Sequence, residues 1–287
     1  MLTISPNDTP QPLFHHYMLS SIAPRPIAFA STIDENGQPN LAPFSFFNAF
    51  GSNPPIVIFS PARSGREGTT KHSYNNVKKV PEAVINVVSY SMVQQASLAS
   101  AEYPKDVNEF VKAGFTAIPS VKVRPFRVKE SPVQIECKVL EVKEMGDKGG
   151  AANLIICEIA LIHVSRDVLD SENKIDPNKI DLVGRMGGNW YCRASGANLF
   201  ELAQPGRNLG IGIDALPERI KNSKILTGND LGKLGNVTHL PTESELKDYK
   251  PNRKYDNEED IYTEAKKLLD TGRSEDALKF LMANLLK

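Results

Sequence analysis

Three short segments near the start of the chain carry side chains that could hold a small ligand. In "APRPIA" Arg25 lies between two prolines, and Ser31 and Thr32 end the strand-like run that follows. Residues 42–52, "APFSFFNAFGS", set hydroxyl and amide groups among aromatic rings: Phe44, Ser45, Phe46, Phe47, Asn48, Phe50 and Ser52. Residues 69–76, "TTKHSYNN", add hydrogen-bonding groups and a cation: Thr69, Thr70, Lys71, His72, Ser73, Asn75 and Asn76.

This combination of side chains suits a ligand with a flat aromatic part and a phosphate. Aromatic and apolar surface can stack on a ring, while Arg, Lys and hydroxyl groups can bind a dianion. Flavin mononucleotide (FMN) fits this description, and pyridoxal phosphate or haem are alternative ligands. Each segment also has an ordinary interpretation, with the phenylalanines in the core, Arg25 and Lys71 as solvated charges and His72 as a structural histidine.

The elements that must position these segments have the pattern of short strands. Residues 26–33 form an apolar, β-prone run, and the Asn36-Gly37 turn signal followed by "LAPFSFF" predicts a hairpin. Further strands are predicted in "PIVIFSPA" and "EAVINVVSY", the first of them beginning after Pro54-Pro55 at the end of a loop under the ligand. Short helices are predicted in "SMVQQASLASAEYP" and "VNEFVKAGF", the second ending at Gly114.

Residues 120–164 return to a strand pattern. Val133, Ile135, Cys137 and Val139 alternate with polar residues, whereas "NLIICEIALIHV" is nearly continuous apolar sequence and is expected to be buried. Several short strands with minor helices predict an antiparallel barrel or sandwich over residues 1 to about 195.

The last third of the chain has a different composition. It is polar and rich in turns until about residue 257, and then predicts two amphipathic helices over residues 258–270 and 274–286, with Ser274 as the N-cap of the second. One helical pair cannot bury its own apolar face, so we expect it to pack against the barrel or a partner.

Charge and cysteine content exclude some classes of function. Lys plus Arg and Asp plus Glu both number 34 in this 287-residue chain, which gives no global field for nucleic acid or an anionic membrane. No run of about 18 apolar residues occurs. The three cysteines lack zinc-site spacing and are expected to be buried free thiols, which favours a cytoplasmic location.

The ordered motifs bear a family resemblance. "RPIAFASTIDENGQPNLAPFSFFNAFGSNPPIVIFS" strongly resembles the flavin reductase-like, FMN-binding split-barrel family, which includes flavoredoxins and the reductase components of two-component monooxygenases. "KHSYNNV" stands where that family has Lys-Asp-Thr followed by Asn, and "GRMGGNWY" is similar to its late Arg-Leu-Gly-Gly-Tyr-Tyr motif. The resemblance covers about residues 15–195. It implies a mainly β fold, an antiparallel split β-barrel with short flanking helices over residues 1–205, and a helical C-terminal extension over 206–287.

The resemblance also implies a set of cofactor-binding residues. The candidates for phosphate and ribityl are Arg25, Ser31, Thr32, Lys71, His72, Ser73 and Asn76, and those for the isoalloxazine are Ser45, Phe46, Phe47, Asn48 and Ser52. His72 stands where the family has an acid, and Ser73 where it has threonine. Such proteins are typically homodimers, which would bring Arg185 or Trp190 toward the partner's FMN.

The chemistry implied is hydride transfer from NADH or NADPH to N5 of the flavin, with electrons passed on to free flavin, a monooxygenase partner, iron or oxygen. Donors near N1 and the C2 carbonyl would stabilise the reduced ring, and no catalytic acid or base is assigned. No GxGxxG follows a predicted strand, so a Rossmann site for the nicotinamide nucleotide is not expected. A non-catalytic FMN-binding or electron-carrier protein is the alternative.

Overall fold

The structure is a computed structural model that describes residues 1–202, 209–249, 255 and 257–286. The chain divides into two compact units, residues 1–200 and 201–287. The sequence predicted a boundary between 205 and 206, which falls within residues 203–208 and therefore outside the described part.

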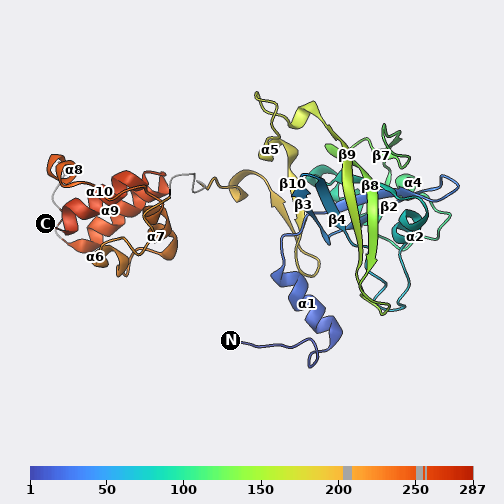
Figure 1. The fold of residues 1–287 in the computed structure, drawn as a ribbon, viewed down its shortest axis with the longest axis horizontal. Coiled ribbons are helices and arrows are strands. Elements are labelled where there is room, and N and C mark those ends of the chain that lie inside the picture. Colours follow the sequence, from blue (N-terminus) through green and yellow to red (C-terminus); the bar gives the residue numbers. More distant parts are fainter. Residues whose placement is uncertain (203–208, 250–254, 256, 287) are drawn as a thin grey trace. The chain divides into compact units, whose positions relative to one another are not determined.

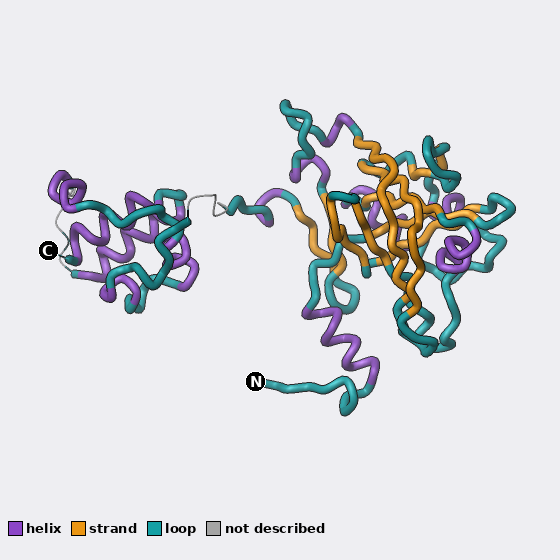
Figure 2. Tube along the Cα trace, viewed as in Figure 1, coloured by secondary structure: helices purple, strands orange, loops and turns teal. Residues whose placement is uncertain are grey.

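The first unit is built on one seven-stranded sheet with the order β2-β1-β5-β8-β9-β4-β3 (Figures 1 and 2). All its neighbouring strands are antiparallel. The strands are β1 (Ala28–Ile33), β2 (Pro39–Phe44), β3 (Phe47–Ser52), β4 (Pro55–Phe59), β5 (Glu82–Val87), β8 (Val133–Glu144) and β9 (Asn153–Val164). Two small pairs join β6 (Ala117–Ile118) to β7 (Arg127–Val128), and β10 (Leu182–Arg185) to β11 (Tyr191–Ala194).

The predicted first hairpin is confirmed. β1 and β2 pair antiparallel, with Ser31 opposite Leu41. The turn between them is stabilised by Asp34, whose Oδ1 accepts the N–H groups of Asn36 (2.9 Å) and Gln38 (3.0 Å). Gly37 has a φ of +82°, a backbone conformation that side chains with a Cβ rarely adopt.

A second hairpin replaces the loop predicted before Pro54-Pro55. β3 runs from Phe47 to Ser52 and pairs with β4, which begins at Pro55. Its residues beyond Phe47 are exposed, so the burial alternation that marks a strand in sequence is missing. β2 and β3 form the opposite edges of the sheet, yet only Ser45 and Phe46 separate them in the chain. The two edges of the sheet are therefore brought together at this link.

The core of this unit lies on both faces of the sheet. One cluster gathers Phe59, Ile85, Cys137 and Cys157, and another packs Phe29 and neighbouring residues against the helices between 90 and 115. β9 was expected to be buried along its whole length, but this is wrong. Burial alternates only in its first half, and the second half includes exposed residues such as Ile162.

Short helices flank the sheet, and Figure 1 shows α2 and α4 next to its β2 end. Both predicted helices after residue 90 are confirmed, and Gly114 ends α4 in the left-handed conformation. The elements are α1 (Gln11–Ser21), α2 (His72–Lys79), η1 (Tyr90–Met92), α3 (Val93–Leu98), α4 (Glu109–Ala113), η2 (Arg166–Val168), α5 (Pro177–Ile180) and η3 (Gly196–Asn198).

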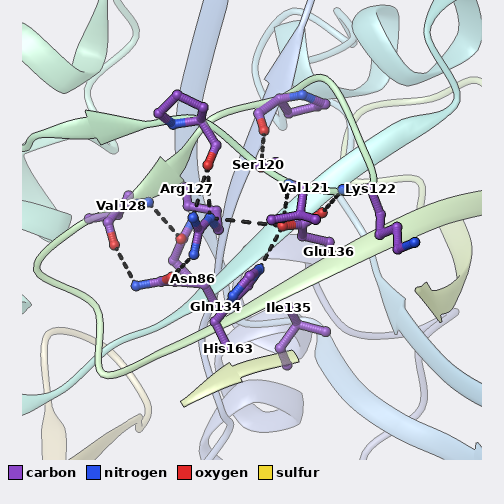
Figure 3. Close-up of polar contacts among 12 residues, drawn as sticks. Asn86, Ser120, Val121, Lys122, Arg127, Val128, Gln134, Ile135, Glu136 and His163 are labelled. Carbon is purple, nitrogen blue, oxygen red and sulfur yellow. Dashed lines mark hydrogen bonds and ion pairs between the residues drawn. The ribbon is translucent and has the colours of Figure 1, made fainter. Parts of the chain in front are cut away.

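A buried carboxylate ties the segment around β6 and β7 to the sheet (Figure 3). Glu136 on β8 is fully buried, and it accepts the N–H groups of Val121 (2.9 Å) and Lys122 (2.5 Å). Nε2 of His163 lies 2.7 Å from Oε1 of Glu136, and Nε of Arg127 lies 3.8 Å from the same oxygen. Burial alone would raise the pKa of Glu136, but the two backbone donors and His163 outweigh it and lower that pKa.

The second unit has a core of its own. Its helices are α6 (Glu218–Lys221), α7 (Gly228–Gly235), α8 (Glu243–Asp248), α9 (Glu258–Asp270) and α10 (Ser274–Leu285). The predicted pair α9 and α10 is confirmed, although Arg273, and not Ser274, occupies the N-cap position of α10. The expectation that this pair needs an outside surface is wrong, because Leu278 and Leu281 are buried together with Ile220 and Leu234 of α6 and α7.

Two further findings concern membrane spans and cysteines, on which the composition gave predictions. Within the described ranges, the helices are all too short or too polar to span a bilayer. The three cysteines are free, with Cys137 and Cys157 buried and Cys192 half-buried.

Candidate functional site

A cavity of about 390 Å³ opens where the link between β2 and β3 meets the start of α2. Its walls come from the end of β2, residues 60–62, the N-terminus of α2, residues 99–103 and the first residue of α4. This places distant parts of the chain around one space. The lining residues are Asn40, Ala42, Pro43, Phe44, Ser45, Phe46, Ser60, Ala62, Thr69, Thr70, Lys71, His72, Ser73, Ala99, Ser100, Ala101, Glu102, Tyr103 and Glu109.

One end of the cavity is suited to an anion. Thr69, Thr70 and Lys71 lead directly into α2, whose first turn has N–H groups without partners inside the helix. Lys71 makes an ion pair with the exposed carboxylate of Glu102. Because an exposed ion pair contributes little free energy, an incoming phosphate can replace Glu102.

Aromatic rings contribute another part of the wall. Phe44, Phe46 and Tyr103 line the cavity, and Phe46 is 36% exposed. Phe44 also packs on Phe59 of the core, with ring centroids 5.9 Å apart. These rings offer a surface on which a planar ligand can lie.

Hydrogen bonds behind the wall fix its polar groups. Nδ2 of Asn40 donates to Oγ of Ser73 at 2.8 Å, which connects β2 to α2. Oγ of Ser60 accepts the N–H of Asn153 at 3.2 Å. The hydroxyl groups of Ser60 and Ser73 are therefore held in place before any ligand binds.

Glu109 is a buried carboxylate in this wall. It is 5% exposed, and its Oε2 accepts the N–H of Leu41 at 3.1 Å from the edge strand β2. Burial raises the pKa of Glu109, while backbone donors and nearby His72 partly oppose that rise. The cavity thus holds an acid that binds its proton more tightly than an exposed glutamate.

Five of the predicted cofactor residues line the cavity: Ser45, Phe46, Lys71, His72 and Ser73. Two others bind each other in the interior, since Nδ2 of Asn76 donates to Oγ1 of Thr32 at 3.1 Å. Ser31 is fully buried, and its hydroxyl has no hydrogen-bond partner among the described residues. Contact of these buried residues with FMN stays a prediction.

The remaining predicted residues do not line the cavity, although Nε of Arg25 donates to Oγ of the wall residue Ser45 at 3.5 Å. Phe47 packs against the core cluster, and Asn48 and Ser52 are exposed on β3. The Arg25 guanidinium is buried, where it donates to the carbonyl oxygens of Leu19, Ile22 (2.8 Å) and Met186 (3.0 Å). These carbonyls use most of its donors, so Arg25 stabilises the chain around α1, and its predicted contact with phosphate is untested.

Sequence reasoning missed the wall formed by residues 99–109. Glu102 and Tyr103 fall within the first predicted short helix, 91–104, and Glu109 within the second, 107–115, where acids are usually solvated. The signal available was the cluster "ASAEYP", which places small, acidic and aromatic residues directly after an apolar helix.

The residues present fit FMN. The cavity lies within the usual size range of ligand pockets. It combines a cation and the N-terminus of a helix at one end with aromatic rings and hydroxyl groups elsewhere. A metal centre is not indicated, because the part of the chain that is described holds no group of three or more His, Cys, Asp or Glu placed to bind an ion.

The C-terminal unit has a depression of about 540 Å³ lined by residues such as Arg219, Glu258 and Tyr262. Arg219 and Glu258 form an ion pair with each other, and the Tyr262 hydroxyl donates to the Arg219 carbonyl oxygen (2.7 Å). These groups satisfy one another, so we assign no ligand to this depression.

Comparison with known proteins gives a consistent result. The chain is 36% identical over 179 residues to an uncharacterized protein of Aquifex aeolicus, covering 62% of this chain and 89% of the relative. The structure of nitrilotriacetate monooxygenase component B from Bacillus cereus matches with a TM-score of 0.65 and 27% identity, over 70% of this chain and 98% of that one. Flavoredoxin of Desulfovibrio vulgaris, at 22% identity and a TM-score of 0.54 over 63% of this chain and 90% of that one, shares the fold.

The likeness to solved split barrels confirms the predicted antiparallel split-barrel fold, and the structure itself shows the flanking helices and the helical extension. The family description "flavin reductase like domain" matches residues 19–177, which is more than half of the chain and includes every wall of the cavity. The chain belongs to the flavin reductase-like family.

Proposed function

We propose that this protein binds FMN in the cavity beside α2 and acts as an NAD(P)H-dependent flavin reductase. The observation that carries the proposal is the joint placement of Lys71, the N-terminus of α2 and the aromatic residues around one space of suitable size. The similar structures of a monooxygenase component and of a flavoredoxin support electron transfer through a flavin.

The residues of the chain would bind and orient the cofactor. Lys71 and the hydroxyl groups of Thr69 and Thr70 would hold the phosphate, with the first turn of α2 adding N–H donors. Phe44, Phe46 and Tyr103 would limit where the ring lies. The bound FMN supplies hydride acceptance at N5 and onward electron transfer.

Two acid–base groups face the same space. Glu109 is buried with a raised pKa, and His72 lies close enough to influence it. Hydride transfer itself needs neither group as an acid or base, so their role would be to set the charge around the ring. An ionised Glu109 would oppose the negative charge of the reduced flavin, whereas a protonated Glu109 would not.

The test starts with the absorption spectrum of the purified protein and titration of the protein with FMN. Anaerobic single-turnover mixing with NADH and with NADPH then measures reduction, and steady-state assays with free flavin, ferric iron and oxygen identify the acceptor. Failure to bind FMN after reconstitution would reject the proposal. Bound FMN that neither donor reduces would instead indicate an electron carrier.

We also propose a homodimer, with a monooxygenase partner among the electron acceptors. β3 is an edge strand of the sheet, and Phe50 on it is 63% exposed. Trp190, in the turn between β10 and β11, is 78% exposed. Sedimentation of the wild type and of Phe50→Ser tests this, since a dimer through β3 should weaken in the variant.

The free thiols favour residence in the reducing cytoplasm.

A further inference from the structure

A second cavity of about 360 Å³ adjoins the first one. The two share Pro43, Ser45 and Ser100 in their walls, so Ser45 at the link between the sheet edges lies between them. The far side of the second cavity is formed by Arg185 and Tyr191 of the β10–β11 pair. A ligand in the second cavity is thus next to whatever occupies the first.

Arg185 brings an unneutralised positive charge to this cavity. Its guanidinium carbon lies 4.6 Å from the centre of the Tyr191 ring, and no carboxylate of the described residues pairs with it. Arg193 on the same hairpin is the opposite case. It lies 4.0 Å from the Tyr90 ring and makes two hydrogen bonds to Asp181, at 2.7 and 2.8 Å.

The backbone holds Arg185 in a fixed position. Its N–H donates to the carbonyl oxygen of Arg25 (2.8 Å), and the N–H of Arg25 donates back to the carbonyl oxygen of Arg185 (2.9 Å). A Cβ at Gly184 would lie 2.8 Å from Cβ of Pro24, so only glycine allows this close approach. The backbone that carries the Arg185 side chain is therefore held in a fixed position.

The charge of Arg25 adds to the local positive field but is not available to a ligand, because its guanidinium binds backbone carbonyls. Burial and the neighbouring charge of Arg185 both lower the pKa of Arg25. The rest of the wall is apolar at Ile27, Val88, Val93 and Ala96, with Ser97 and Asn189 as hydrogen-bonding residues. An arginine among such groups suits a phosphate carried by a larger, partly apolar molecule.

We propose that the second cavity binds the phosphate-bearing part of the nicotinamide nucleotide, with Arg185 as the residue that pairs with its phosphate. This inference rests on the proposed reductase function, because it assigns the donor of electrons to a cavity that adjoins the FMN cavity. It gives the nucleotide a binding site without a Rossmann motif.

The experiment compares wild type, Arg185→Ala, Arg185→Lys and the matched control Arg193→Ala, all loaded with FMN. Calorimetry measures binding of ADP, which carries the pyrophosphate but no nicotinamide. Loss of a charge-assisted hydrogen bond predicts about 10- to 100-fold weaker ADP binding for Arg185→Ala. Arg185→Lys should lose less, and Arg193→Ala should bind ADP like the wild type.

Kinetics provide a second readout. For Arg185→Ala the KM for NADH or NADPH should rise with kcat little changed, while oxidation of 1-benzyl-1,4-dihydronicotinamide, which has no phosphate, should stay at the wild-type rate. The dissociation constant of FMN should also stay unchanged.

Three outcomes separate the possible errors. Equal ADP binding and equal KM in wild type and Arg185→Ala would overturn the inference but leave the reductase function standing. A large loss of FMN affinity in Arg185→Ala would also overturn it, because the cavity would then belong to the FMN site. Arg185-dependent ADP binding in a protein that oxidises neither donor would support the anion subsite and reject the reductase function.

Discussion

Two buried glutamates in the first unit show how the same side chain serves different purposes. Glu136 lies between β8 and the β6–β7 segment and has two backbone donors, His163 and Arg127 around it. Glu109 lies in the wall of the cavity, where the N–H of Leu41 is its donor from another element. The pKa of Glu136 is lowered and that of Glu109 is raised.

The difference is in how far each charge is compensated. A buried carboxylate with several donors is stable as an anion and holds elements together. One with few donors keeps its proton more readily, and such groups are frequent where ligands bind. The buried network around Glu136 is therefore structural, and the cavity around Glu109 still has capacity to interact with a ligand.

The largest expected effect is a loss of stability at Glu136, whose buried charge is compensated by several donors. Glu136→Gln should lower the free energy of unfolding by about 3 kcal/mol, because an amide cannot accept from both backbone N–H groups and His163. Urea unfolding measures the loss. Glu141→Gln, an exposed position on the same strand, is the control and should change stability by less than about 0.5 kcal/mol. Equal effects of the two variants would contradict a structural role for Glu136.

The next effect concerns ligand binding at the cavity. Lys71→Ala should weaken FMN binding by about 1 to 3 kcal/mol if the lysine pairs with phosphate in a partly desolvated site. Fluorescence titration measures the dissociation constant, with Lys112→Ala on the exposed face of α4 as the control. Glu102→Gln should strengthen binding slightly, since it removes the competing carboxylate. An unchanged constant in Lys71→Ala would show that the phosphate lies elsewhere.

Glu136 and Glu109 should also give stability opposite dependences on pH. A lowered folded pKa means that Glu136 stabilises the protein above its ordinary value of 4.5, and this contribution is lost as pH falls through the folded pKa. A raised folded pKa means that ionisation of Glu109 destabilises the protein as pH rises from 4.5 through the folded pKa. Relative to wild type, Glu136→Gln should therefore lose less stability at pH 4 than at pH 7. Glu109→Gln should gain stability at pH 7 and little at pH 4.

Unfolding midpoints measured between pH 4 and 8 test these opposite slopes. Gln at position 109 can still accept the N–H of Leu41, so the charge is the main change. If the stability difference from wild type changed with pH in the same direction for both variants, the two glutamates would not differ in the way proposed.

The smallest effect is expected at Ser31. Its hydroxyl is buried without a partner among the residues described, so Ser31→Ala removes no hydrogen bond and should change stability by less than about 1 kcal/mol. Ser73→Ala removes the acceptor of Asn40 and should cost more. Thermal unfolding compares the two. A large loss of FMN affinity in Ser31→Ala would instead show that this hydroxyl serves the cofactor, as the family resemblance predicts.

Local signals explain which parts of the fold could be predicted from sequence. Asn36-Gly37 predicted the first hairpin, and Gly114 the end of α4, because both depend on a few adjacent residues. β3 was missed because its exposed residues have no burial pattern. The core of the second unit was missed because α6 and α7 are short and polar, and their buried residues become a core only when they meet α9 and α10.

In the site, too, only features that depend on adjacent residues could be predicted. Lys71 and Ser73 could be predicted from a motif, but Glu109 could not, because its burial depends on β2, which is distant in the sequence. The partners of Arg25 include Met186, 161 residues away, so its use as a structural residue was not visible in "APRPIA".

The link at Ser45 and Phe46 has a consequence for the order of assembly. β2 and β3 are adjacent in the chain but are separated across the sheet by β1, β5, β8, β9 and β4, most of which are translated later. The cavity wall at this link is therefore completed only when strands from residues 28 to 164 have paired. A ligand bound there stabilises the whole closed sheet by mass action, so cofactor supply during synthesis would raise the yield of folded protein.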